Sequence, residues 1–466
     1  MMVDFENYQS PYSWRYASSE MRQVWSEWNK RLIWRKLWVA LAEAEARFGL
    51  ITEDQVADLR LHAEQIDIRR ALEIEAEIHH DLMAEVRTFA EQCPLGGGMI
   101  HLGATSMDIE DNADAIRLRQ SLAIVLGRLV KLLILFAEKI ETWAEKPVMA
   151  FTHLQPAEPS TLGYRLASYA QDLLEDWQVL KALHNAIRGK GFKGAVGTAA
   201  SYAELVGLHN LDEFEDQLSR TLDLPFFPIT TQTYPRKQEY SVVSGLAGLG
   251  ASLYKFAFDL RLLQSPPVGE LSEPFGAKQV GSSAMPFKRN PVSAEKIDSL
   301  ARLLAVFPQV TWQNAAHSLL ERTLDDSANR RTVLAEAFLI SDEMLLTTLR
   351  IVKGLVVNEV AIQRNLEIYA PFASSERVLM ALVKAGADRQ EMHERLRKHS
   401  LAAWEAVQKG QSNPLVEFLR ADPLILNLLG AETIQQLNHL DAYSGIAPQR
   451  AHQIAETIRK TLQSRD

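Results

Sequence analysis

The feature that most constrains this chain is an unbroken apolar stripe within residues 112–143. Its apolar side chains recur at spacings of three and four, and they are Ile116, Leu118, Leu122, Val125, Leu126, Leu129, Leu132, Leu133, Phe136 and Ile140. This spacing is the period of an α-helix, and thirty helical residues extend about 45 Å. A fold that contains such a helix has to bury its stripe against other helices of similar length.

Comparable helical patterns occur in several other segments, namely 20–47, 161–188, 238–264, 292–320, 328–353 and 376–408. Residues that break helices are sparse, since 23 glycines and 18 prolines make 41 of 466 residues. That is about 9%, against a usual value of about 12%. We find no convincing run of alternating strand residues, so the sequence predicts an all-α fold.

Two boundaries divide the chain into three predicted helical domains. A glycine-rich stretch ends near residue 105, and Asn358 follows an apolar run that ends near 357. We therefore expect an N-terminal helical domain over 1–105 and a C-terminal helical domain over 358–466. The domain between them, 106–357, is predicted to be a central bundle of long helices.

Charge and composition exclude several classes of function. The net charge of −9 and the pI near 5.8 disfavour nucleic acid as a partner. A single cysteine, Cys93, cannot form an intramolecular disulfide or a cysteine-rich zinc site, and it suits a reducing compartment. The N-terminus does not resemble a signal peptide. The longest uncharged run, between Arg302 and Glu321, contains Pro308 and Asn314, so we expect a cytoplasmic protein without membrane contact.

One irregular segment, residues 281–291, reads Gly-Ser-Ser-Ala-Met-Pro-Phe-Lys-Arg-Asn-Pro. Its composition alone is that of an ordinary surface loop. Flexible glycine and serines between restricting prolines also suit a lid over an active site. A serine acts as a base at neutral pH only where donors stabilise its alkoxide. The residues themselves do not decide between Ser282 and Ser283 as that base.

This segment resembles the signature of the fumarase/aspartase superfamily. Its Ala-Met-Pro-aromatic-Lys-Arg-Asn-Pro portion resembles the adenylosuccinate lyase family within that superfamily. The resemblance extends over nearly the whole chain. It implies that Ser282 abstracts a proton, and that Lys288 and Asn290 hold the dicarboxylate part of the substrate.

A second segment, Phe-Thr-His-Leu-Gln-Pro from residue 151, resembles the family region that carries the general acid. A lone histidine is more often structural than catalytic. The resemblance implies that His153 is the acid, with Thr152 beside it in the substrate site. It also implies that Glu295, thirteen residues after Ser282, pairs with His153. Such a carboxylate orients the imidazole and raises its pKa.

The stretch His-Leu-Gly-Ala-Thr-Ser from residue 101 resembles another family region, which implies that Thr105 and Ser106 bind a carboxylate. A second reading is a helix start with Ser106 as N-cap and acidic residues in the first turn. The two readings are compatible, because a helix N-terminus also presents free N–H groups.

The segment 321–331 precedes a strong helical stripe, so Ser327 is predicted to lie at a helix N-terminus. Arg330 and Arg331 would then occupy the first turn, where cations are unfavourable unless an anion binds. An alternative is a local Asp–Arg cluster, worth about 0–1 kcal/mol if exposed. The resemblance assigns Arg322, Ser327 and Arg331 to the phosphate of a nucleotide.

The remaining substrate-binding residues also follow from the resemblance. Arg15 and Tyr16 join the phosphate site. Gln232 matches a substrate-binding glutamine of the family, and His80 and Asp81 match a His–Asp pair used in nucleotide binding. No third and fourth ligand is spaced near the histidine pair, so we expect no metal.

Two positions depart from the close family pattern, which has arginine at both. They are His79 and Lys296. Lysine keeps the charge but loses the bidentate fork. These departures leave the relative preference for the two natural substrates of the family open.

The resemblance implies a carbon–nitrogen lyase that eliminates fumarate from adenylosuccinate, giving AMP, and from the succinylated aminoimidazole carboxamide ribotide. It implies no cofactor, and a homotetramer in which three subunits build each site. Three alternatives were weighed. Argininosuccinate lyase shares the chemistry, but the arginine-rich 322–331 segment argues against it, and fumarase needs no phosphate site. A structural protein, as lens crystallins are, is disfavoured because Ser282, His153, Lys288 and Glu295 are all present.

Overall fold

The computed structural model describes residues 6–437 and 443–463. They form mainly helices, with four short strands, which confirms the all-α prediction. The chain divides into two compact units, each assembled from three stretches. The first unit comprises residues up to 129, 176–251 and 299–346; the second comprises 130–175, 252–298 and 347 onward. The predicted boundaries coincide with the starts of two helices, but the three-domain division stays a prediction.

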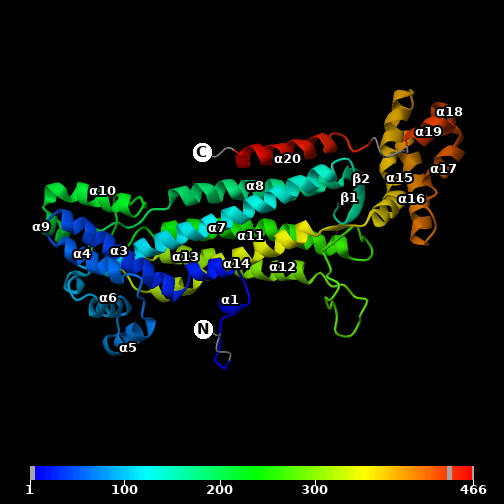
Figure 1. Cartoon of the computed structure of the whole chain (residues 1–466). Coiled ribbons are helices and arrows are strands. Elements are labelled where there is room, and N and C mark those ends of the chain that lie inside the picture. The colour runs from blue at the N-terminus through cyan, green and yellow to red at the C-terminus, as the bar shows by residue number, and fades with distance from the viewer. Residues whose placement is uncertain (1–5, 438–442, 464–466) are drawn as a thin grey trace. The chain divides into compact units, whose positions relative to one another are not determined.

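The first unit contains the N-terminal helices and parts of the long ones (Figure 1). Its elements are α1 (Pro11–Trp14), α2 (Ser19–Val24), α3 (Glu27–Arg47), α4 (Glu53–His62), α5 (Ile68–Ile78), α6 (Asp81–Gln92), η1 (Gly97–Met99), α9 (Ala200–Val206), η2 (Leu208–Asn210), α10 (Leu211–Thr221) and α13 (Phe307–Ala316). One apolar core of this unit surrounds α3, where Trp38, Leu37 and Leu41 are at most 1% exposed.

Five longer helices run from one unit into the other along the chain. They are α7 (Ser106–Thr142), α8 (Leu162–Ala186), α11 (Lys237–Gln264), α12 (Val292–Leu304) and α14 (Ser327–Lys353). The stripe predicted in 112–143 lies in α7, and its residues Leu118, Leu122 and Phe136 are fully buried. Burial of such side chains contributes about 1.5–3 kcal/mol each.

The second unit contains two small antiparallel sheets and the C-terminal helices. Its other elements are β1 (Pro147–Thr152), β2 (Gln155–Thr161), β3 (Leu271–Ser272), β4 (Val356–Val357), α15 (Glu359–Lys384), α16 (Arg389–Gln408), α17 (Leu415–Ala421), α18 (Pro423–Leu429), α19 (Ala431–Leu437) and α20 (Ala447–Gln463). Helices α15 to α19 enclose a separate apolar core around Leu382, Leu415 and Ile425.

Four expectations about local structure were wrong in detail. The 20–47 pattern is two helices, α2 and α3, because Ser26 caps a new helix start. The 292–320 pattern is two helices, α12 and α13, because Pro308 favours a new helix start. The 376–408 pattern is likewise split between α15 and α16, and Gly386 adopts φ 93° in the connection. The β1–β2 hairpin was not predicted, since prolines at 156 and 159 conceal the strand pattern.

Two helices, α7 and α11, are long and apolar enough to cross a membrane by length and composition alone. In each, 44% of the most apolar window is buried within the protein itself. Core helices of bundles pass the same test, so this is weak support for a membrane span.

Candidate active site

The 281–291 loop joins β3 to α12 and is closed by its own hydrogen bonds. Asn290 Nδ2 donates to the Gly281 carbonyl at 2.9 Å, and Gln264 Nε2 donates to the Arg289 carbonyl at 2.9 Å. A Cβ atom on Gly281 would lie 2.2 Å from the Lys288 carbonyl oxygen, so only glycine fits there. The loop is therefore compact, and part of the Asn290 amide is used to close it.

The Ser282 hydroxyl lies within this loop as a hydrogen-bond acceptor. Its Oγ accepts from the Met285 backbone N–H at 3.1 Å and, more weakly, from that of Ala284 at 3.4 Å. Backbone donors aimed at an oxygen stabilise negative charge on it. Ser283 receives no such bond within the described residues. The geometry thus favours Ser282 over Ser283 as the base, a choice that residue types left open.

Glu295 lies in the first turn of α12, close to the loop. The start of this helix is capped by Glu273, which accepts from the N–H groups of Ser293 at 3.1 Å and Ala294 at 3.0 Å. The Glu295 carboxylate is 3.8 Å from the Arg261 guanidinium, and Lys296 next to it is partly buried. Lys288 is exposed on the loop itself.

His153 occupies the two-residue turn of the β1–β2 hairpin, between the paired residues Thr152 and Gln155. Both turn residues have positive φ, 52° at His153 and 60° at Leu154. Such turns usually contain Asn and Gly, and each other L-residue there costs about 1–2 kcal/mol. A strained, exposed histidine is typical of a functional position.

A pocket beside His153 contains charged residues that sequence reasoning missed. It is lined by Arg165 and Tyr169 from α8 and by Lys255 and Asp259 from α11. Tyr169 donates its hydroxyl to Asp259 at 2.7 Å. Burial and the Asp259 charge raise the pKa of Tyr169. These residues sit at ordinary helical positions, so no sequence signal distinguished them.

The predicted pairing of His153 with Glu295 is not formed within one chain. Among the described residues, His153 makes no hydrogen bond or ion pair, and the ion-pair partner of Glu295 is Arg261. The pairing therefore stays a prediction that a second subunit would have to satisfy.

A separate pocket in the first unit contains two of the predicted phosphate residues, Ser327 and Arg331, together with Asp81. Parts of α3, α6, α7 and α14 line it, whereas Arg15, Tyr16 and Arg322 are not among its lining residues. Ser327 is the first residue of α14, as predicted. Arg331 donates to the Asp81 carboxylate at 2.7 Å. Helix N-termini and a guanidinium are the groups that bind phosphate.

Asp81 and His80 begin helix α6 beside this pocket. Burial opposes ionisation of Asp81, but the hydrogen bond and charge of Arg331 outweigh it and hold the Asp81 pKa below its usual range. His80 is the N-cap, and its Nδ1 accepts from the Met83 N–H at 3.3 Å. That bond needs an unprotonated Nδ1, which leaves Nε2 as the ring atom that can donate to a ligand. His79 ends α5 with φ 55° and is exposed.

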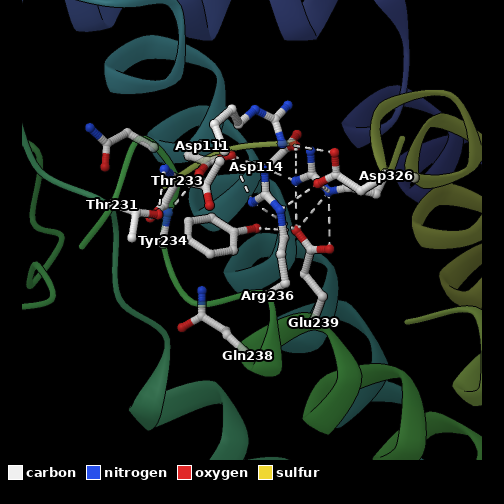
Figure 2. Close-up of polar contacts among 12 residues, drawn as sticks. Asp111, Asp114, Thr231, Thr233, Tyr234, Arg236, Gln238, Glu239 and Asp326 are labelled. Atoms are coloured by element: carbon white, nitrogen blue, oxygen red, sulfur yellow. Dashed lines mark hydrogen bonds and ion pairs between the residues drawn. The ribbon is translucent and has the colours of Figure 1, made fainter. Parts of the chain in front are cut away.

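The two neighbouring arginines of α14 have different surroundings. Arg331 is exposed, whereas Arg330 is buried and donates to Glu239 at 2.6 Å and to Asp114 at 2.9 Å. Arg236 joins the same network through Asp111 and Asp326 (Figure 2). The expectation that both arginines invite a ligand anion was wrong for Arg330, because its anions are carboxylates of the protein.

Arg322 belongs to the same network, because its guanidinium donates to the Asp326 carboxylate at 2.8 Å. The Gln232 backbone N–H donates to the Glu321 carbonyl at 3.2 Å, which brings the loop before α11 to this segment. Arg322 and Gln232 therefore lie on adjoining segments, as a shared substrate role requires.

Thr105 and Ser106 stand at the start of α7. Ser106 is the first helical residue, so the N-cap is Thr105. The expectation that Ser106 is the N-cap was wrong by one residue. The Thr105 N–H donates to the Asp108 carboxylate at 3.0 Å. Asp108 is fully buried and also forms an ion pair with Lys190, so it fixes the start of the helix.

Arg15 and Tyr16 lie between α1 and α2. The Arg15 guanidinium is 6.0 Å from the centre of the Tyr16 ring. The next residues bind α14, since the Ala17 and Ser18 N–H groups donate to Glu343 at 2.9 Å and Asp342 at 2.7 Å. This pair is thereby tethered to the helix that begins with Ser327.

The predicted residues thus form groups within each unit. The first unit brings together Asp81, Ser327 and Arg331 around one pocket. The second holds Ser282, Lys288 and Asn290 on one loop and His153 on the hairpin.

Comparison with known proteins defines the class first. The sequence profile of the lyase family matches residues 11–304. A crystal structure of a fumarate lyase from Mesorhizobium sp. BNC1 matches with a TM-score of 0.84 and 25% identity, over 97% of this chain and 99% of that one. The 3-carboxy-cis,cis-muconate lactonizing enzyme from Pseudomonas putida has the same fold, with a TM-score of 0.87 and 24% identity over 98% and 100% of the two chains. The chain is a lyase of this fold.

The particular family follows from closer relatives. Residues 371–454 match the adenylosuccinate lyase C-terminus. Adenylosuccinate lyase of Saccharomyces cerevisiae is 39% identical over 99% of this chain and 97% of its own length. That of Schistosoma mansoni is 42% identical over 90% and 89%. The chain belongs to the adenylosuccinate lyase family, and it is a carbon–nitrogen lyase.

Proposed function

We propose that this enzyme eliminates fumarate from adenylosuccinate to give AMP, and from the succinylated aminoimidazole carboxamide ribotide to give its carboxamide. The observation that carries the proposal is the Ser282 hydroxyl, held on two backbone N–H groups in the loop typical of the family. An oxygen placed there can carry the negative charge that a serine base requires.

In the proposed reaction, Ser282 takes the proton from the carbon beside the substrate carboxylate. The electrons form the carbon–carbon double bond of fumarate as the carbon–nitrogen bond breaks. His153 gives a proton to the departing nitrogen, which balances the proton taken. Each acid or base role would supply about 10²–10⁴-fold in rate.

Charge that builds on the substrate carboxylate needs fixed donors. We assign this task to residues on the loop and at the start of α7, namely Lys288, Asn290, Thr105 and Ser106, together with Gln232. The exposed Lys288 ammonium and the free N–H groups of a helix start are groups that stabilise such a carboxylate.

The nucleotide phosphate would bind in the pocket at the start of α14, on Ser327 and Arg331. Arg322, Arg15 and Tyr16, which the family resemblance also assigns to the phosphate, do not line this pocket. A phosphomonoester carries about −1.5 to −2 charges at neutral pH. It would compete with Asp81 for the Arg331 guanidinium, whose present partner is 2.7 Å away. Displacing one carboxylate by a dianion that also reaches the helix N-terminus is favourable.

The active enzyme would be a homotetramer in which three subunits contribute to each site. Two observations support this. His153 and Glu295 are not paired within one chain. Large apolar side chains on the long helices are exposed in the single chain, at 52% for Val179 in the first unit and 53% for Phe258 in the second. Apolar surface of this kind is typical of subunit interfaces. A cytoplasmic location is proposed on the single buried cysteine, Cys93.

The test is incubation of the purified protein with adenylosuccinate, with fumarate followed by absorbance and AMP by chromatography. Equal release of both products is expected. Argininosuccinate, offered in parallel, should not react. Release of fumarate from argininosuccinate alone, or from neither compound, would reject the proposal.

A further inference from the structure

The nucleotide pocket holds a carboxyl group to which no role has been assigned. Glu110 lies one turn into α7, lines the pocket with Ser327 and Arg331, and is only partly buried. Among the described residues it makes no hydrogen bond or ion pair. A carboxyl group that faces a phosphate site without a partner needs an explanation, since an ionised one would repel the ligand.

Charged groups face Glu110 from every helix that lines the pocket. Helix α3 contributes Glu27 and Lys30, α6 contributes Asp81, and α14 contributes Arg330 and Arg331. Its own helix adds Asp114 and Arg117 on the pocket wall, and Asp111 is close enough to repel it.

Each cation on the wall already has a carboxylate partner. Lys30 pairs with Glu27, Arg331 with Asp81, and both Arg117 and Arg330 with Asp114. An ionised Glu110 would therefore add a negative charge that no wall cation neutralises, and this charge would repel a phosphate dianion.

We propose that Glu110 is a binding and specificity residue that must carry its proton for the nucleotide phosphate to bind, and that its carboxyl O–H donates to that phosphate. The inference rests on the proposed function of this pocket. Burial, and then the charges of Asp81, Asp114 and Asp111, raise the Glu110 pKa to about 8. The group is thus mostly neutral at pH 7 and becomes anionic only in alkali.

The proposal predicts that affinity for AMP falls in alkali. The apparent dissociation constant scales inversely with the fraction of protein in the competent state. With a pKa of about 8 the neutral fraction is about nine-tenths at pH 7 and about one-tenth at pH 9, so AMP should bind about tenfold more weakly at pH 9. The phosphate is already a dianion over this range.

The experiment measures AMP binding to the full-length enzyme by calorimetry between pH 7 and pH 9, for the parent, Glu110→Gln and Glu45→Gln. Glu45 is the matched control, because burial raises its pKa to about 8 as well, but it lies in the core of the first unit and not on the pocket wall. The tenfold loss is expected in the parent and in Glu45→Gln, and absent in Glu110→Gln. Adenosine, which lacks the phosphate, should show no loss with any variant.

A second measurement uses the parent protein alone, in case a variant fails to fold. Binding of AMP at pH 8, compared in buffers of different ionisation enthalpy, should take up about half a proton per site. Zero uptake, or the same alkaline loss in Glu110→Gln as in the parent, would overturn the role of Glu110 while the proposed function stands. Failure of AMP to bind at pH 7 would overturn both.

Discussion

At the scale of single residues, the Ser282 and Ser283 hydroxyls differ only in what surrounds them. Ser282 Oγ accepts from two backbone N–H groups, and Ser283 is exposed and receives no such bond within the described chain. An alkoxide is stabilised only where donors already point at it. The loop geometry is therefore our reason for proposing Ser282, and not Ser283, as the base.

The first prediction tests this choice. Ser282→Ala should lower kcat on adenylosuccinate by two or more orders of magnitude, because the base is removed. Ser283→Ala should retain most of the parent kcat. Thermal unfolding should be unchanged in both variants, since the side chains are on a surface loop. Near-normal turnover of Ser282→Ala together with loss in Ser283→Ala would show that the base is Ser283.

The second prediction contrasts Arg330 and Arg331. Replacing Arg331 should mainly affect KM, whereas replacing Arg330 should mainly affect the unfolding free energy. Arg331→Ala should raise KM for adenylosuccinate far more than for dephosphorylated succinyladenosine, because hydrogen bonds to charged groups are worth about 1.5–3 kcal/mol. Its unfolding free energy should change less than that of Arg330→Ala, since the Arg331 side chain is exposed and pairs with a single, partly buried carboxylate, Asp81.

Arg330→Ala should instead lower the unfolding free energy by about 3 kcal/mol, because the fully buried Glu239 loses its closest cation and keeps only Arg236, 3.5 Å away. Urea denaturation of both variants checks this contrast. Equal stability losses, or equal KM effects on the two substrates for Arg331→Ala, would contradict the assignment of one arginine to ligand and the other to structure.

At the scale of elements, Asp422 joins α16 to α18 in the second unit. It caps α18, accepting from the Leu424 N–H at 3.0 Å, and it binds His399 at 2.8 Å and Arg395 at 3.0 Å from α16. Burial opposes its ionisation, but hydrogen bonds from His399 and Arg395 outweigh it and lower the Asp422 pKa to about 2. The Asp422 carboxylate thus links the two helices by hydrogen bonds and an ion pair.

The third prediction concerns the pH at which Asp422 is protonated and this link between α16 and α18 is lost. A folded pKa of about 2, below an unfolded value of about 3.9, contributes stability that is present above about pH 4 and lost as pH falls toward 2. Asp422→Asn should therefore lower the unfolding free energy at pH 7 by on the order of 2 kcal/mol.

The measurement is urea unfolding at pH 7 and near pH 3. The deficit of Asp422→Asn relative to the parent should shrink at the lower pH. Asp388→Asn is the matched control, because Asp388 also caps a helix, α16, and asparagine caps equally well. A deficit that is independent of pH would contradict the charge-based explanation.

At the scale of the whole molecule, the fourth prediction concerns sharing of the active site. Ser282→Ala and His153→Ala proteins should each be nearly inactive. After mixing under conditions that allow subunit exchange, part of the activity should return, because some hybrid sites receive both intact residues. Exchange is verified by native mass spectrometry of differently tagged chains. A mixture that exchanges but stays inactive, or an active species that sediments as a monomer, would refute the shared site.

Much of this architecture was predictable from local patterns. The apolar period of α7, the helix start at Ser327 and the loop that holds Ser282 could all be read from neighbouring residues. Local periodicity and turn chemistry are properties of short stretches, and helices follow them because their hydrogen bonds are local.

Other features were decided only by tertiary structure. Arg330 and Arg331 are adjacent and chemically identical, yet one is buried because Asp114, 216 residues away, and Glu239 converge on it. The His153 turn holds two strained residues that no local propensity favours, so the pairing of β1 with β2 has to impose it. Contacts between distant residues determine burial, pairing and strain, and a linear pattern carries no record of which distant residues will meet.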